Sequence, residues 1–275
     1  MAESTGLPAI LLGPAGVVAA GVFGAIWGSF FNVCIARVPL GQSVVRPGSR
    51  CDDCGAPVRA QDNIPLVSYL LLRGRCRACH ARIDPAVPVV ELLAAALAAA
   101  LWWKFVATDP AAALAVRAAR LAHYFAFAGV LLVLSAIDLR SKRLPDVITL
   151  PAIPILFLSG FGAHDVGWLE RLIGGAAGYL VFRLPSDFYY YVLKREGLGL
   201  GDAKLLALIG VVLGWKALAF VIFTGGFVGA LVSIPFVIRA RTSLRTAEVP
   251  FGPFLALSAL VYLFAGRWIF EVWLG

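Results

Sequence analysis

Long apolar stretches separated by short polar segments run along the whole chain of 275 residues. No charged residue occurs between Ser4 and Ala36, which predicts a first membrane span at about 10–34. All but one of these apolar stretches are close to the roughly 20 residues that a helix needs to cross the hydrocarbon core of a bilayer. The further stretches lie at about 85–103, 119–137, 147–164, 169–192, 203–215, 217–238 and 250–270. The pattern therefore predicts an all-α, polytopic membrane protein with about eight transmembrane helices.

Two of these predicted spans are irregular. Arg171, Arg183, Pro185 and Asp187 interrupt the stretch at 169–192. The stretch at 203–215 is short enough to form a half-span or a tilted helix.

Composition supports a membrane protein. Hydrophobic residues make up 60% of the chain and charged residues 15%, whereas an average soluble domain has about 45–50% and 25%. This composition excludes a water-soluble globular enzyme. The net charge of +8 would indicate a nucleic-acid partner in a soluble protein, but in a polytopic membrane protein such an excess reports the cytoplasmic loops.

The positive residues alternate between loops and so predict orientation. One set of alternate loops is basic, and the opposite loops, near 104–120, 163–168 and 215, are poorer in Lys and Arg. The basic loops carry Arg37, Arg46, Arg50, Arg59, Arg73, Arg75, Arg77 and Arg82; Arg140, Lys142 and Arg143; Lys194 and Arg195; and Arg239, Arg241 and Arg245. The positive-inside rule places these loops in the cytoplasm and both termini outside, and no nucleic-acid binding is expected. We predict three parts: a first span at 1–36, a cytoplasmic loop at 37–84 and the remaining helices at 85–275.

The first cytoplasmic loop contains two C-x-x-C pairs. Cys51 and Cys54 are separated by 21 residues from Cys76 and Cys79. Four thiolates at this spacing are typical of a tetrahedral zinc site, and a full set of four ligands makes the zinc structural rather than catalytic. Structural disulfides and a thioredoxin-like redox pair compete with zinc, but they fit poorly with a cytosolic loop that lacks a βαβ context. His80, beside Cys79, is an alternative ligand or a solvated loop residue.

Two carboxylates lie at the cytoplasmic boundaries of predicted spans. Asp138 ends the apolar run 131–137, and Asp202 opens the run 205–210 after a glycine-rich segment. Ionisable groups at membrane depth cost a few kcal/mol, so they are candidates for function. A close pair of carboxylates shares a proton, and such a pair hydrolyses peptides when the ionised member activates water and the protonated member donates a proton.

Other interpretations of these residues stay open. Asp202 would also fit an N-cap, because an Asp after a glycine-rich loop satisfies free helix amides. The glycines Gly199 and Gly201 allow a substrate backbone to approach closely. The serine-hydrolase and zincin motifs are missing from the sequence, and the 197–201 glycines match no phosphate-loop pattern.

Five short motifs, in order along the chain, resemble those of the type IV prepilin peptidases, a family of bifunctional leader peptidases and N-methyltransferases of bacterial inner membranes. The motifs are Gly28–Val33 with Arg37, Val38 and Pro39; Asn63–Tyr69 between the two cysteine pairs; Asp138 with Leu144, Pro145 and Asp146; Gly199–Lys204; and Pro250–Phe254. The resemblance covers most of the chain.

The resemblance implies an aspartic peptidase of the G-x-G-D type that removes the leader of prepilins or secretion pseudopilins at the cytoplasmic face. Asp138 and Asp202 would be catalytic, and Gly199, Gly201, Asp146 and Lys204 would support them. The family's methylation of the new N-terminus implies S-adenosylmethionine as methyl donor, with no binding residue visible in the sequence.

Two further acids and one arginine lie within or beside the predicted spans. Glu91 matches a family acid of open role, and Arg183 and Asp187 are spaced to pair on one helix face. The alternative from another class is a non-enzymatic transport or assembly protein with a cytoplasmic zinc knuckle. The sequence carries no prediction of oligomeric state.

Overall fold

The structure is a computed structural model that describes residues 12–109, 111–193, 199–240 and 250–274. The chain divides into two compact units, Met1–Phe125 and Ala126–Gly275, with the division inside helix α5 (Leu114–Ser141). The predicted basic positions Lys194, Arg195, Arg241 and Arg245 lie outside the described residues, as do both termini. The predicted division into residues 1–36, 37–84 and 85–275 stays a prediction.

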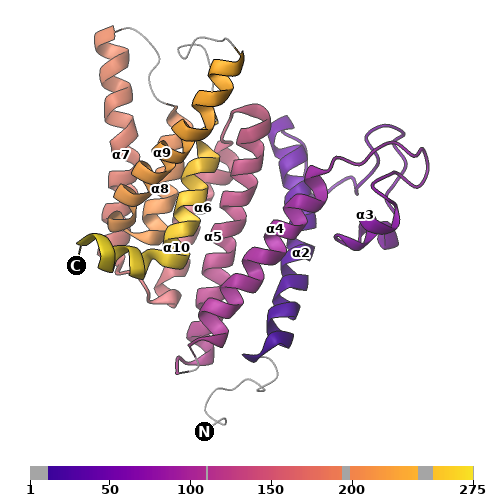
Figure 1. Ribbon diagram of the computed structural model, residues 1–275, viewed down its shortest axis with the longest axis horizontal. Coiled ribbons are helices and arrows are strands. Elements are labelled where there is room, and N and C mark those ends of the chain that lie inside the picture. The colour runs from indigo at the N-terminus through magenta and orange to yellow at the C-terminus, as the bar shows by residue number, and fades with distance from the viewer. Residues whose placement is uncertain (1–11, 110, 194–198, 241–249, 275) are drawn as a thin grey trace. The chain divides into compact units, whose positions relative to one another are not determined.

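The first unit is built on a pair of helices, α2 (Pro14–Arg37) and α4 (Ala86–Trp102), which pack along each other (Figure 1). Helix α4 continues into the π-helical turn η3 (Trp103–Ala107). Glycines on α2 permit the close approach: a Cβ added at Gly28 would lie 2.7 Å from the Cα of Glu91. Asn32 of α2 also donates a 3.0 Å hydrogen bond to the carbonyl of Val87.

Residues 38–85, called the cysteine segment below, connect these two helices. They include the short helices η1 (Val38–Leu40), η2 (Ala60–Asn63) and α3 (Val67–Leu71). Arg37, the last residue of α2, fixes the start of the segment, because its guanidinium donates to the carbonyls of Ser43, at 3.1 Å, and Pro47, at 2.8 Å.

The second unit contains α6 (Asp146–Ala163), α7 (Trp168–Leu193), α8 (Leu200–Leu213), α9 (Trp215–Ala240) and α10 (Gly252–Leu274). Helix α8 forms its core, since every residue from Leu205 to Leu213 is buried. A helix that is apolar all round is stable only when it is enclosed in this way. Glycines bring α7 against α8 (Figure 1): a Cβ at Gly178 would lie 2.7 Å from the carbonyl carbon of Leu206.

A buried arginine joins three helices of this unit. Arg171 of α7 is 2% exposed, and its guanidinium donates to the carbonyls of Val211, at 3.0 Å, and Leu156, at 2.6 Å. It also lies over the ring of Phe157, 5.1 Å from the centroid. The charge that interrupts the predicted span at 169–192 is thus directed into the protein, against carbonyl groups of α6 and α8.

An all-helical membrane architecture is confirmed. In the described part of the chain, a helix overlaps each of the eight predicted apolar stretches. Five segments of this part are long and apolar enough to cross a membrane: Pro14–Leu40, Ala86–Ala107, Leu114–Ser141, Asp146–Ala163 and Trp215–Ser233. Helix α8 has 14 residues and so measures about 21 Å, less than the roughly 30 Å of a hydrocarbon core.

Candidate active site and metal centre

The ends of four helices bring the predicted acidic residues together in the second unit. Asp138 lies one turn before the end of α5, and Asp202 lies in the first turn of α8. Asp138 is buried, with 5% of its surface exposed, and Asp202 is partly buried. The charge of Asp138 acts on the Asp202 carboxyl, so the two groups lie within electrostatic reach although 64 residues separate them in sequence.

The start of α10 completes this site. The backbone N–H of Gly252 donates a 3.0 Å hydrogen bond to Oδ2 of Asp138. A Cβ added at Gly252 would lie 2.8 Å from the same oxygen, so only glycine fits without displacing the carboxylate. Leu144 packs against Gly201 and Gly252. A Cβ added at Gly201 would lie 3.1 Å from the Leu144 side chain, and one added at Gly252 would lie 3.6 Å from it. Leu144 and the Gly252 amide therefore both lie beside the Asp138 carboxylate or the start of α8.

The N-cap interpretation of Asp202 is wrong. Gly199 occupies the N-cap of α8, with extended backbone (φ −61°, ψ 125°), and the helix begins at Leu200 with no side-chain cap. A Cβ added at Gly199 would lie 3.3 Å from Oδ2 of Asp202, so the carboxylate faces the N-cap residue. Its position is set by the glycine-rich start of α8 and not by capping.

The two supporting polar residues form an ion pair. Lys204 of α8 donates a 2.6 Å hydrogen bond to Oδ1 of Asp146, the first residue of α6. Asp146 is 55% exposed, which is much more open than Asp138. This pair links the starts of α6 and α8, and Asp146 is engaged by Lys204.

The four predicted metal ligands meet in the first unit. The Sγ atoms of Cys51, Cys54, Cys76 and Cys79 all lie within 4.8 Å of one another, and those of Cys51 and Cys79 are 3.8 Å apart. A tetrahedral zinc with Zn–S distances of about 2.3 Å requires sulfurs about 3.8 Å apart. The arrangement therefore fits one metal ion with four thiolate ligands.

The backbone around the two cysteine pairs follows the same course twice. Cys51 and Cys76 each donate from their N–H to the carbonyl five residues on, at 2.9 and 2.8 Å. An antiparallel bridge closes each knuckle, between Arg50 and Pro57 and between Arg75 and Arg82. The backbone N–H groups of Cys79 and Ala78 lower the pKa of the Cys76 thiol to about 7, whereas the neighbouring sulfurs raise the pKa of Cys79 to about 12. Four sulfurs this close repel one another when ionised, and a bound metal ion would offset that repulsion.

His80 takes the place in the second knuckle that Gly55 takes in the first. Both residues have left-handed backbone, with φ of 59° and 70°, and their N–H groups donate to the carbonyls of Cys76 and Cys51. Histidine is among the residues that tolerate this conformation better than most. His80 is thus a turn residue beside the cluster, and the ligand set is complete without it.

We expect His80→Gly to retain one metal ion per chain, because Gly relieves the left-handed strain and removes no ligand. The free energy of unfolding of the cysteine segment should rise by up to about 1 kcal/mol. Metal analysis together with amide exchange of the segment checks this. A loss of metal in this variant would instead make His80 a ligand.

Glu91 has a partner that the sequence could not show. It is 6% exposed on α4, and its Oε2 accepts a 2.7 Å hydrogen bond from the backbone N–H of Leu66. Leu66 has an unusual backbone (φ 63°, ψ −47°) and precedes α3. Glu91 therefore ties the cysteine segment to the helix pair, through a contact that depends on tertiary structure.

The expected pairing of Arg183 with Asp187 on α7 is confirmed, with the Nε atom of Arg183 2.8 Å from Oδ2 of Asp187.

Comparisons with known proteins cover most of the chain. Residues 22–105 match the bacterial peptidase A24 N-terminal domain, and residues 125–234 match the type IV leader peptidase family. The prepilin leader peptidase/N-methyltransferase of Pseudomonas putida is 33% identical to this chain over 92% of both chains. The protein of the same name in Aeromonas hydrophila is 36% identical over 90% of this chain and 91% of its own length. A relative of the same name in Myxococcus xanthus is 38% identical over 88% of this chain and 69% of its own. No solved structure gave a significant match.

These matches define the class: a polytopic membrane protein of the peptidase A24 type. The chain belongs to the prepilin leader peptidase/N-methyltransferase family.

Proposed function

We propose that the protein is an aspartic endopeptidase that cleaves the leader peptide from type IV prepilins or type II secretion pseudopilins and then methylates the new N-terminus. The observation that carries the peptidase is that Asp138, bonded to Gly252, and Asp202 lie at the ends of α5 and α8 within electrostatic reach of each other. The family membership supports the same activity.

In the proposed hydrolysis one of the two carboxyl groups acts as general base and the other as general acid. The ionised carboxylate takes a proton from a water molecule, whose oxygen attacks the scissile carbonyl carbon. The protonated partner donates its proton to the carbonyl oxygen, which gives a gem-diol intermediate. The first carboxyl then passes the proton that it took from water to the amine as the C–N bond breaks, and the partner regains a proton from a hydroxyl group of the collapsing intermediate. No covalent enzyme intermediate forms, and the pair ends with one proton, as it began.

Backbone groups orient this pair. The Gly252 N–H holds Oδ2 of Asp138, which leaves Oδ1 for the water or the partner carboxyl. The missing side chain at Gly201 accommodates Leu144, and the missing side chain at Gly199 leaves the Asp202 carboxylate uncrowded. Asp146 and Lys204 support the site by fixing the starts of α6 and α8 through their ion pair.

Two groups beyond the polypeptide belong to this proposal. Zinc, held by Cys51, Cys54, Cys76 and Cys79, would be structural, since four thiolates leave no open coordination position. S-adenosylmethionine would supply the methyl group, on the strength of the relatives' names, and we assign no residue to it.

The proposed location is the bacterial inner membrane, with both termini in the periplasm. The concentration of Lys and Arg in alternate loops supports this orientation. This orientation places the C-terminal end of α5 and the N-terminal end of α8, which carry the two carboxylates, at the cytoplasmic side.

The decisive experiment uses the purified full chain in proteoliposomes with a prepilin and a pseudopilin as separate substrates. Mass spectrometry should show loss of the leader and, after addition of S-adenosylmethionine, the mass gain of one methyl group on the mature product. Intact substrate with a correctly inserted protein would favour the transport or assembly alternative.

Replacing Gly252 by Ala should reduce leader cleavage by about 10- to 100-fold, because the new methyl group displaces a carboxylate whose position catalysis depends on. Gly226→Ala is the matched control, since an added Cβ at Gly226 meets no atom within 4 Å. Initial cleavage rates in proteoliposomes measure both variants. Equal rates for the two would show that the Gly252 contact does not position Asp138.

A further inference from the structure

The cysteine segment exposes a pair of leucines at the end of a very short helix. Leu70 and Leu71, the last residues of α3, are 74% and 76% exposed. Their direction is fixed by Ser68, which is buried and whose Oγ accepts from the Ile64 N–H at 2.9 Å and donates to the Gln61 carbonyl at 3.0 Å. The leucines therefore form a stable apolar projection, called the leucine tip here.

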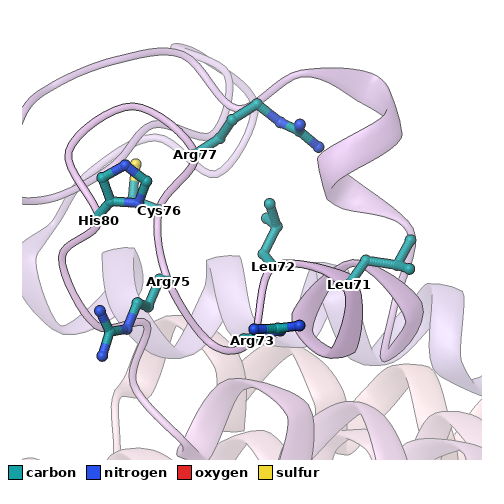
Figure 2. A pocket seen from close by; sticks show the side chains of 7 residues that line it. All are labelled: Leu71, Leu72, Arg73, Arg75, Cys76, Arg77 and His80. Atoms are coloured by element: carbon teal, nitrogen blue, oxygen red, sulfur yellow. The ribbon is translucent and has the colours of Figure 1, made fainter.

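The chain reverses directly after the leucine tip and brings arginines beside it. Arg73 and Gly74 are both left-handed, with φ of 52° and 66°, and the Arg75 N–H then donates to the Leu72 carbonyl at 3.1 Å. A cavity of about 710 Å³ lies at this reversal. Figure 2 shows Leu71 and Leu72 on the side opposite Cys76 and His80, with Arg73 and Arg75 along one edge and Arg77 across from them.

The three arginines of the cavity are not equivalent. Arg77 makes a bidentate ion pair with Asp62, with distances of 2.6 to 3.1 Å, and its hydrogen bonds hold the pKa of Asp62 below its usual range. Asp62 thus neutralises Arg77. Arg73 and Arg75 are exposed beside the leucines, and guanidinium groups suit bidentate contacts with phosphate.

The attachment of the segment determines which surface it meets. Its 48 residues begin at the end of α2 and finish at the start of α4, two helices suited to cross a membrane that pack along each other. Both attachment points therefore lie at one face of the bilayer. The segment contains seven arginines, four aspartates and no lysine or glutamate. A zinc ion with four thiolates would add a charge of about −2, so the segment stays only slightly positive overall, and the exposed Arg73 and Arg75 supply the local charge that complements an anionic lipid surface.

We propose that the cysteine segment docks on anionic phospholipid headgroups, with Leu70 and Leu71 inserted at the acyl boundary and Arg73 and Arg75 binding lipid phosphates. Interfacial amphipathic helices bind membranes with apolar side chains at the acyl boundary and basic side chains at the headgroups, and the leucine tip with its arginines presents the same two kinds of group. The docking would hold the metal knuckles against the bilayer surface. This binding site goes beyond the proposed peptidase and methyltransferase activities and does not depend on them.

Amide hydrogen exchange of the full chain in nanodiscs tests the proposal. One set of discs contains phosphatidylcholine alone and the other equal parts of phosphatidylcholine and phosphatidylglycerol. We expect the amides of residues 70–75 to exchange about tenfold more slowly in the anionic discs, and this difference to shrink at high salt. The zinc content of each sample shows that the knuckles are folded.

Two double variants make the test specific. R73Q/R75Q should abolish the difference between the two lipids, and L70S/L71S should raise exchange in both. R46Q/R59Q removes the same charge from exposed positions elsewhere in the segment and should keep most of the difference. Equal exchange in both lipids, or equal loss in the R46Q/R59Q control, would overturn the proposal. Protection that appears only when prepilin is added would also overturn it and identify the tip as a substrate surface.

Discussion

Asp202→Asn is expected to lower leader cleavage by about 10³-fold or more, because the neutral amide can neither take nor hold the proton that the pair shares. Asp138→Asn should do the same. The two single variants and the double variant D138N/D202N should be about equally inactive. Because the two carboxylates act as one unit, removing either one already abolishes the catalysis that both provide, and removing the second costs little more. Initial rates with a purified prepilin, read by mass spectrometry, measure all three.

The control for this loss is Asp187→Asn, the same substitution at a half-exposed acid of α7 that pairs with Arg183. It should retain near-normal cleavage. Normal membrane insertion of every variant separates a catalytic defect from a folding defect. An active Asp202→Asn protein would refute the catalytic pair, and an inactive Asp187→Asn protein would attribute the losses to general destabilisation.

Cys54→Ala is expected to reduce bound zinc to well below one ion per chain and to unfold the cysteine segment. Structural zinc sites contribute about 10–16 kcal/mol of apparent binding free energy at neutral pH, and this short polar segment has little core to replace it. Metal analysis and amide exchange of residues 50–82 measure the loss. Chelation of the wild-type protein should produce the same exchange pattern.

Cys34→Ala provides the matched control, because Cys34 lies on α2 and outside the four-cysteine cluster. It should retain a full metal content. Zinc retained in Cys54→Ala would contradict the four-thiolate site, and zinc lost in Cys34→Ala would point to a different ligand set.

Much of this molecule could be predicted from the sequence because its strongest patterns are local. The apolar stretches predict the helices, and the spacing of Cys51, Cys54, Cys76 and Cys79 predicts a cluster that the structure forms. What the sequence lacks are contacts between distant backbone groups. Nothing in the pattern around Glu91 reveals that it accepts a hydrogen bond from the Leu66 amide.

Charged residues inside apolar stretches show the same limit of local patterns. Arg171 weakens a predicted span when only its neighbours in sequence are considered. Its actual surroundings include carbonyl groups of two other helices, α6 and α8, which accept hydrogen bonds from the guanidinium. Likewise, Gly252 is one more glycine in the sequence, and only the folded chain shows that its amide contacts Asp138. Such roles depend on packing, which single-sequence periodicity does not encode.

The repeated backbone course of the two cysteine knuckles makes them equivalent halves of one ligand set. The octapeptides 50–57 and 75–82 both begin with Arg and Cys, place the second Cys four residues after the Arg, and continue with a left-handed residue and Ala. The same hydrogen bonds around Cys51 and Cys76 show that each octapeptide forms its knuckle in the same way and supplies two of the four sulfurs. The two octapeptides are then interchangeable halves, and a chain carrying the 50–57 sequence at both places would keep its four sulfur ligands.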